Sequence, residues 1–301
     1  MTIPRTLQVR VAAKINLFLR VLGRRSDGFH ELESVFQSVS IFDTLLIEPA
    51  AHALQLQCSA PGVPVDETNL VLRAARALQS LPHAPPDAGA KIELRKQIPV
   101  GAGLGGGSAD AAAALVGLAY LWEMNPSPEQ LAVLAAALGS DVPFFLRGGA
   151  CLVRGRGEVL QRLPVPAPWW LVVVKPPFSV ATPAAYAAWR PAPPDAPALD
   201  EFLHAWGEAD LQRVAACLRN DLEAGVVARY PAIAAARARL LDARAVGTRM
   251  TGSGSAVFGV TGSEAEARRI ASVIPADIGQ TFVARFLTAE EARPRVQKEK
   301  E

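Results

Sequence analysis

A glycine-rich segment between an expected strand and an expected helix most constrains what this chain can be. Residues 99–109 read Pro-Val-Gly-Ala-Gly-Leu-Gly-Gly-Gly-Ser-Ala and include five glycines. The apolar residues within 91–98 are typical of a strand, and the alanine-rich run 109–121 favours a helix. A glycine loop before a helix exposes backbone N–H groups and the positive end of the helix dipole, and glycine lets the backbone close around an anion. The arrangement predicts a phosphate-binding loop.

Three known glycine loops fit this segment poorly. Gly101, Gly103 and Gly106 match the dinucleotide pattern G-x-G-x-x-G, but the residues 127–130 begin a second helix where a strand ending in an acidic residue is needed. Residues 107–109 lack the lysine of a Walker A loop. The tripeptides His-Arg-Asp and Asp-Phe-Gly of protein kinases are absent from the chain. A plain flexible turn remains the structural alternative.

Composition excludes several broad classes. A net charge of +2 over 301 residues, with scattered basic residues, argues against a nucleic-acid partner. No apolar run approaches the length that spans a membrane, and the first residues lack the apolar core of a signal peptide. Cys58, Cys151 and Cys217 lie far apart, which favours reduced thiols. We therefore expect a cytoplasmic protein without a nucleic-acid or membrane partner. Its expected partner is a small-molecule substrate, and its expected state is a monomer or a weak homodimer.

The order of elements predicts an α+β fold in two parts. Strict alternation over 9–21 indicates a long half-buried strand, or two strands joined at a bulge. The first part, residues 1–163, is expected to hold a mixed or mostly antiparallel sheet with helices; its further strands fall at 34–41, 44–48, 54–58 and 91–98, and its helices at 69–81, 108–124 and 128–138.

The second part, residues 164–301, follows a proline-rich stretch at 163–168. Its pattern is typical of a ferredoxin-like split βαβ domain, with strands at 169–175, 249–251, 256–260 and 281–287 and helices at 208–219, 231–242 and 263–273. The polar run 292–301 is expected to fray.

Two charged side chains are candidates for chemistry. Lys14 shares a strand face with Asn16 in an otherwise apolar strand, so a buried and partnered lysine competes with the usual solvated one. Asp141 follows a helix that stops at Gly139. It is either a helix cap or turn former, or a general base that orients a hydroxyl.

An aromatic pair follows an expected turn. The turn signal Asp27-Gly28 places Phe29 and His30 at its exit. A histidine at such a place is commonly a surface or packing residue. A stacking face beside a hydrogen-bonding ring also suits a heterocyclic base.

Taken together, these segments resemble the GHMP kinases, and among them the branch whose acceptor carries a cytidyl diphosphate group. The resemblance covers about residues 8 to 287 and rests on five motifs, in order: Lys14-Ile-Asn16, Asp27-Gly-Phe-His30, Pro99–Ala109, Gly139-Ser-Asp-Val-Pro143 and Thr251-Gly-Ser-Gly-Ser255. It implies the two-domain GHMP kinase fold. It also implies transfer of a phosphoryl group from ATP to the 2-hydroxyl of a cytidyl-linked methylerythritol, in the non-mevalonate isoprenoid pathway.

The resemblance also implies a role for each site residue. Asp141 would take the proton of the hydroxyl, and Lys14 would pair with Asp141 and steady the transferring group. The ATP contacts would come from Asn69, Pro99, Val100, Gly101, Ala102, Gly103, Leu104, Gly105, Gly106, Gly107, Ser108 and Ala109. The acceptor contacts would come from Asn16, Phe29, His30, Thr182 and Tyr186, with Phe29 and Tyr186 enclosing the cytosine. Mg²⁺ would be held mainly by phosphates and water.

Two other functions remain open at this point. Another small-molecule GHMP kinase, for homoserine, mevalonate or a sugar, would not need the aromatic pair. A ligand-binding regulator with this fold would not need both Lys14 and Asp141.

Overall fold

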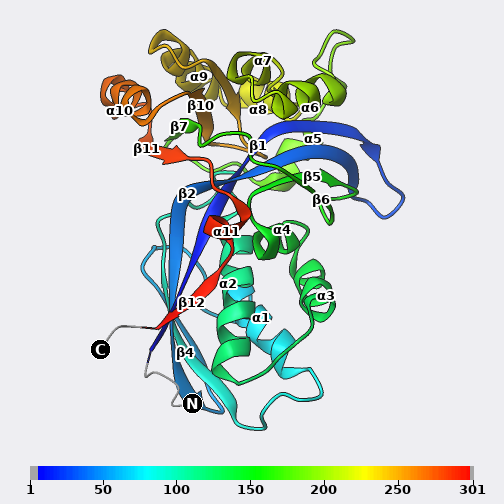
Figure 1. Cartoon of the computed structure of the whole chain (residues 1–301), viewed down its shortest axis with the longest axis vertical. Helices are drawn as coiled ribbons and strands as arrows, with labels where there is room; N and C mark the ends of the chain where they lie inside the picture. The colour runs from blue at the N-terminus through cyan, green and yellow to red at the C-terminus, as the bar shows by residue number, and fades with distance from the viewer. Residues whose placement is uncertain (1–5, 299–301) are drawn as a thin grey trace.

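The computed structural model describes residues 6–298 and contains two sheets (Figure 1). The first sheet is built on two long antiparallel strands, β1 (Leu7–Arg24) and β2 (His30–Ala51). Its strand order is β12-β1-β2-β4-β3, while β5 pairs with β2 and β6, and β8 with β1. The remaining strands are β3 (Leu54–Cys58), β4 (Ala88–Arg95), β5 (Ala150–Arg154), β6 (Val159–Leu163), β8 (Arg219–Asn220) and β12 (Arg295–Lys298).

Four helices cover one face of this sheet (Figure 1): α1 (Leu70–Gln79), α2 (Gly106–Leu121), α3 (Pro128–Leu138) and α4 (Val142–Arg147). The central helix α2 is alanine-rich and mostly buried, as expected of a helix inside a core, and Asp110 is its one charged residue. A Cβ at Gly117 would lie 2.5 Å from the Cδ1 atom of Ile47 and 2.8 Å from the Cγ2 atom of Val9. The small residues of α2 therefore let it lie close against β1 and β2.

The second sheet has the antiparallel order β11-β7-β10-β9 expected of a ferredoxin-like domain. Its strands are β7 (Trp170–Lys175), β9 (Gly247–Met250), β10 (Val257–Thr261) and β11 (Gln280–Arg285). Its helices are α5 (Thr182–Ala187), α6 (Leu199–Gly207), α7 (Leu211–Ala216), α8 (Glu223–Arg229), α9 (Ala232–Asp242) and α10 (Glu264–Val273), and the short α11 (Ala289–Ala292) follows β11. The α+β class and both sheet types are confirmed.

Several local predictions need correction. β1 is buried on both faces from Val11 to Leu19, because its second face lies against other parts of the chain instead of water. The strands expected at 34–41 and 44–48 are one strand, β2, whose register shifts opposite Ala12 and Ala13. The helix expected at 208–219 covers only 211–216.

The chain also returns to the first sheet after the second one is complete. Residues 295–298 do not fray but form β12, which pairs with β1, while 299–301 lie outside the described residues. The boundary between 163 and 164 stays a prediction, and the first sheet takes strands from both sides of it. Within residues 6–298, no helix is long and apolar enough to cross a membrane.

Candidate active site

A cavity of about 1210 Å³ joins the predicted motifs. Parts of both sheets and their loops line it, including Lys14, Asn16, Phe29, His30, Asn69, the glycine loop from Pro99 to Ser108, Asp141, Thr182, Tyr186 and Gly252–Gly254. Residues more than two hundred positions apart therefore meet around one space large enough for two small molecules.

The glycine loop is pressed against a turn from the second part of the chain. Gly103 accepts a hydrogen bond from the hydroxyl of Thr251 (3.2 Å), and Ala102 accepts one from the backbone N–H of Ala256 (3.1 Å). A Cβ at Gly103 would lie 2.1 Å from the carbonyl oxygen of Thr251. The next glycine in the loop, Gly105, precedes α2 with φ of 75°, in the left-handed region. Glycine is thus required both by close approach and by backbone conformation.

Lys14 is buried and partnered, as the apolar strand suggested. Only 4% of the residue is exposed, and its ammonium donates to Oδ1 of Asn16 at 2.6 Å and lies 3.5 Å from Oδ2 of Asp141. The ammonium also lies 4.4 Å from the centroid of the Phe36 ring. Burial lowers the pKa of Lys14, and the Asp141 carboxylate opposes that shift.

Asn16 links this lysine to both neighbouring segments. Its side-chain amide donates to the hydroxyl of Ser34 at 3.0 Å, and its Oδ1 lies 3.3 Å from the Thr251 hydroxyl oxygen. Its backbone N–H donates to the same Thr251 hydroxyl at 3.0 Å. The Lys14 ammonium is therefore held in place by a satisfied network.

Asp141 lies at the N-cap position of α4 but makes no capping hydrogen bond with its side chain. About a third of that side chain (33%) is exposed, and the carboxylate lines the cavity. A Cβ at Gly157 would lie 3.5 Å from its Oδ1, so the turn between β5 and β6 passes close by. Asp141 therefore begins the helix without capping it through its side chain, which leaves the carboxylate available to a ligand.

The aromatic pair forms part of a larger ring cluster. His30 stacks on Tyr186 with centroids 4.8 Å apart and contacts Trp189 edge-on at 6.1 Å. Burial and the charge of Arg24 lower the pKa of His30, and both effects favour the neutral ring. Phe29 is 47% exposed and has the guanidinium of Arg156 4.9 Å from its ring centroid. Tyr186 thus packs on His30 and not directly on Phe29, although all these rings line the same cavity.

Of the other residues predicted to contact a ligand, some line the cavity and one does not. Asn69 caps α1 by accepting from the N–H of Val71, and it also lines the cavity. Thr182 lies within 3.0 Å of the Ser253 hydroxyl, and Ser108 lies in the first turn of α2. Ala109 is fully buried in the core and does not line the cavity.

A buried charge cluster beside the glycine loop was not predicted from the sequence, and two of its members, Lys96 and Asp110, line the cavity. Lys96 donates to the carboxylates of both Asp43 and Asp110, and the Asp43 carboxylate also accepts the N–H groups of Gln97 and Ile98 at 2.6 and 2.8 Å. Burial outweighs the Lys96 ammonium and raises the pKa of Asp110 to about 8, with the Asp43 charge adding to the rise. Because Lys96 lies three residues before Pro99, a cation near the loop could have been suspected, but its two partners could not.

The raised pKa of the Asp110 carboxyl group makes the stability of the folded protein depend on pH. Its raised pKa means that the folded state holds a proton which the unfolded chain loses near its ordinary pKa of 3.8. This group therefore destabilises the fold increasingly as pH rises from about 4 to about 8. We expect Asp110→Asn to raise Tm more at pH 8 than at pH 5, measured by calorimetry. An equal change at both pH values would contradict the raised pKa.

Comparison with known proteins agrees with this geometry. The family model of the GHMP kinase N-terminal domain matches residues 69–149, and that of the C-terminal domain matches 198–278. The 4-diphosphocytidyl-2-C-methyl-D-erythritol kinase of Moorella thermoacetica is 46% identical over 91% of this chain and 96% of its own length. The protein of that name from Pelotomaculum thermopropionicum is 48% identical over 86% of this chain and 91% of its own.

Solved structures show the same relationship. A crystal structure of 4-(cytidine 5'-diphospho)-2C-methyl-D-erythritol kinase has a TM-score of 0.79 at 36% identity, covering 93% of this chain and 98% of its own. Homoserine kinase from Cytophaga hutchinsonii, at 22% identity and a TM-score of 0.73 over 99% of each chain, shares the fold. The chain therefore belongs to the GHMP kinases and, within them, to the family of 4-diphosphocytidyl-2-C-methyl-D-erythritol kinases.

Proposed function

We propose that this protein transfers the γ-phosphoryl group of ATP to the 2-hydroxyl of 4-diphosphocytidyl-2-C-methyl-D-erythritol, giving the 2-phosphate and ADP. One observation carries the proposal: the Lys14–Asp141 pair lies in one cavity with a glycine loop and with the His30–Tyr186 stack. The loop suits a triphosphate, the pair suits a reacting hydroxyl, and the rings suit a base. The acceptor hydroxyl would lie between the donor and the cytosine.

In this mechanism Asp141 accepts the proton of the 2-hydroxyl as its oxygen bonds to the γ-phosphorus. The bond from that phosphorus to the bridging oxygen breaks, and ADP carries away the electron pair. The Lys14 ammonium, fixed by Asn16, stabilises the charge on the transferring group and orients Asp141. The backbone N–H groups of the glycine loop and the N-terminus of α2 would bind the remaining phosphates.

Mg²⁺ would neutralise charge on the phosphates of ATP. Within residues 6–298, no cluster of three His, Cys, Asp or Glu side chains could hold a metal by itself. Oxygen donors that line the cavity include the Ser108 hydroxyl, the buried Asp110 carboxyl group and the partly exposed Asp141 carboxylate. This set suits an ion ligated mainly by phosphate and water, and Ser108 would be its protein contact.

The remaining expectations belong to the same proposal. The acceptor and ATP are the partners, with no nucleic acid, and the protein works in the cytoplasm as a monomer or a weak homodimer. Mevalonate and homoserine lack a base, so they would leave the His30–Tyr186 stack unused.

A panel of alcohols tests the proposed function. The purified protein is incubated with Mg·ATP and the cytidyl acceptor, mevalonate, homoserine or galactose, and ADP release is measured. We expect turnover with the cytidyl acceptor alone. Equally efficient turnover with another alcohol would refute the proposed acceptor. No turnover with any of the alcohols would favour the alternative that the protein is a ligand-binding regulator.

The cytosine subsite has its own test. His30→Ala removes the ring that would hydrogen-bond the cytosine and the side chain that Tyr186 stacks on. We expect KM for the cytidyl acceptor to rise up to about tenfold, since a lost hydrogen bond costs about 0.5–1.5 kcal/mol and 1.4 kcal/mol is a factor of ten. KM for ATP should stay unchanged. His204→Ala, an exposed histidine on α6 away from the cavity, is the matched control. An unchanged KM for the acceptor would contradict the role of His30.

A further inference from the structure

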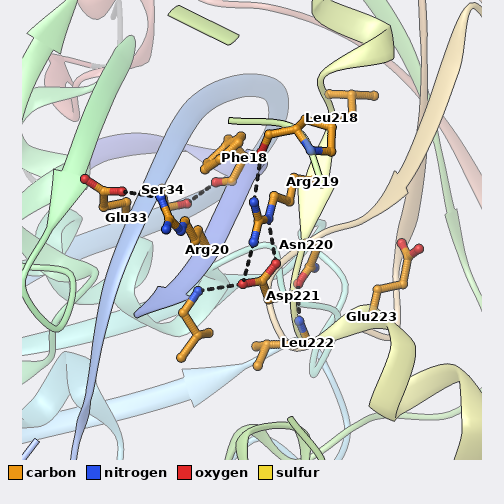
Figure 2. A network of polar contacts seen from close by, with 12 residues as sticks. Phe18, Arg20, Glu33, Ser34, Leu218, Arg219, Asn220, Asp221, Leu222 and Glu223 are labelled. Carbon is orange, nitrogen blue, oxygen red and sulfur yellow. Dashed lines mark hydrogen bonds and ion pairs between the residues drawn. The ribbon is translucent and has the colours of Figure 1, made fainter. Parts of the chain in front are cut away.

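The segment Arg219–Glu223, here called the strut, lies beside β1 (Figure 2). It also hydrogen-bonds to the turn Thr251–Gly254, which contacts the glycine loop. We infer that the strut positions the reactants: Asn220 fixes the turn Thr251–Gly254, and through it the glycine loop and Asn16. This inference rests on the proposed function, because it assigns the strut to the same phosphoryl-transfer site. Asn220 is a positioning residue and has no direct contact with the reacting atoms.

The strut is anchored on β1 by backbone pairing and by the Asp221 side chain. Its residues 219 and 220 pair in parallel with Phe18 and Leu19 of β1. The Asp221 carboxylate accepts the backbone N–H of Val21 at 2.9 Å, and the backbone N–H of Asp221 donates to the carbonyl of Leu19 at 2.9 Å. Figure 2 shows Asp221 lying between β1 and the guanidinium of Arg219, to which it is also paired at 2.7 Å. The strut is thus fixed to the strand that carries Lys14 and Asn16.

The Asn220 side chain holds the turn through hydrogen bonds to its backbone. Its side-chain amide donates to the carbonyls of Met250 and Gly252 at 2.7 and 2.8 Å, and its Oδ1 accepts the N–H of Leu222 at 3.0 Å. Every polar atom of this buried side chain therefore has a partner. Glu223 adds a contact on the same segment, because its carboxylate accepts the N–H of Met250 at 2.6 Å.

The turn held in this way touches both halves of the site. Its Thr251 hydroxyl donates to the Gly103 carbonyl of the glycine loop and contacts Asn16, the partner of the Lys14 ammonium. A Cβ at Gly252 would lie 3.0 Å from the carbonyl of Gly103 and 3.3 Å from Oδ1 of Asn16, so the fit tolerates little movement. A shift of the turn would displace the phosphate loop and the Lys14 network together.

The donors of Asn220, and not its bulk, should therefore set the geometry of the site. Asn220→Asp keeps the shape but replaces both N–H donors with an acceptor that faces two carbonyls. Asn220→Ala removes the group altogether. Because a misplacement of about 1 Å can cost up to about a hundredfold in rate, we expect both variants to lower kcat by about tenfold to a hundredfold.

Binding of nucleotide gives a readout that does not depend on the acceptor. We expect Kd for Mg·AMP-PNP, measured by calorimetry, to rise at least about fivefold in both Asn220 variants, in line with the loss of about one hydrogen bond. KM for the cytidyl acceptor should change less than kcat, because the Asn220 side chain bonds to Met250, Gly252 and Leu222 and not to the His30–Tyr186 stack.

Loss of stability alone is excluded by a matched pair of controls. Ile270, on α10, is fully buried in the same part of the chain and does not line the cavity. Ile270→Val and Ile270→Ala bracket the loss of Tm expected for the Asn220 variants, and both should keep kcat and nucleotide Kd near the wild-type values below their Tm.

The outcomes separate the strut from the proposed function. Turnover by the wild-type protein with the cytidyl acceptor tests the proposed function. The nucleotide Kd of the Asn220 variants, compared with that of the Ile270 controls, tests the positioning role of the strut. This comparison holds whether or not the cytidyl compound is the acceptor. Asn220 variants that lose Tm but match the Ile270 controls in nucleotide Kd and kcat would overturn the inference.

Discussion

Asp141→Asn should lower kcat by about 10²–10⁴-fold, the range for loss of a general base. The amide keeps the size of the side chain and can still lie near the Lys14 ammonium, but it cannot take the proton of the hydroxyl. The change also removes the charge that opposes the lowered pKa of Lys14, so we expect the lysine to lose part of its positive charge at high pH. Steady-state kinetics with saturating Mg·ATP and cytidyl acceptor measure the effect.

Binding measurements separate this chemical role from damage to the site. Asp141 makes no capping hydrogen bond in α4, so its replacement should leave the helix and the cavity intact. We therefore expect Kd for Mg·AMP-PNP and KM for the acceptor to stay within about threefold of wild type, below the 1.4 kcal/mol of a tenfold change. A variant with near-normal kcat would show that Asp141 is not the base.

Gly105→Val should abolish nucleotide binding while the fold remains. Gly105 has φ of 75°, which a β-branched residue adopts only under strain, and a Cβ there would lie 2.6 Å from Cζ of Phe145 and 3.2 Å from Cγ of Lys14. The loop must move away from α4 and β1 to relieve these contacts, which takes its N–H groups off the phosphates. We expect Kd for Mg·AMP-PNP to rise at least about a hundredfold, equivalent to about 2.8 kcal/mol.

A glycine in open surroundings provides the control for this substitution. A Cβ at Gly207, the last residue of α6, would meet nothing within 4 Å. Gly207→Ala should leave nucleotide affinity unchanged. Circular dichroism should show the same helix content for both variants. Normal affinity in Gly105→Val would mean that phosphates bind elsewhere.

Local patterns in the sequence predicted much of the fold and the centre of the site. The glycine loop, the alternation around Lys14 and the turn at Asp27 each depend on neighbours within a few residues, and each lies where expected. The order of the strands within each sheet could not be predicted from such local patterns. Strand β12 carries a charged, polar sequence whose only apolar residue is Val296, and it is defined by its pairing with β1 almost three hundred residues earlier.

The missed site residues share one physical reason. Lys96 has partners 53 and 14 residues away, and Asn220 has partners 30 and 32 residues away. From the sequence alone, a lysine or an asparagine at such a position is predicted to be solvated. Only the fold brings it to the carboxylates or carbonyls with which it pairs. Arg156 could not be assigned for the same reason, since its ring partner Phe29 lies on a different loop.

The position of the new phosphate tests the central claim most directly. In the proposed acceptor C2 carries a methyl group and no hydrogen, whereas the other hydroxyl-bearing carbons carry hydrogens. Proton-coupled ³¹P NMR of the product formed with Mg·ATP should therefore show a new phosphomonoester singlet beside the diphosphate signals. A phosphomonoester split by neighbouring protons would place the phosphate on another hydroxyl, and the absence of any new phosphomonoester would contradict the proposed transfer.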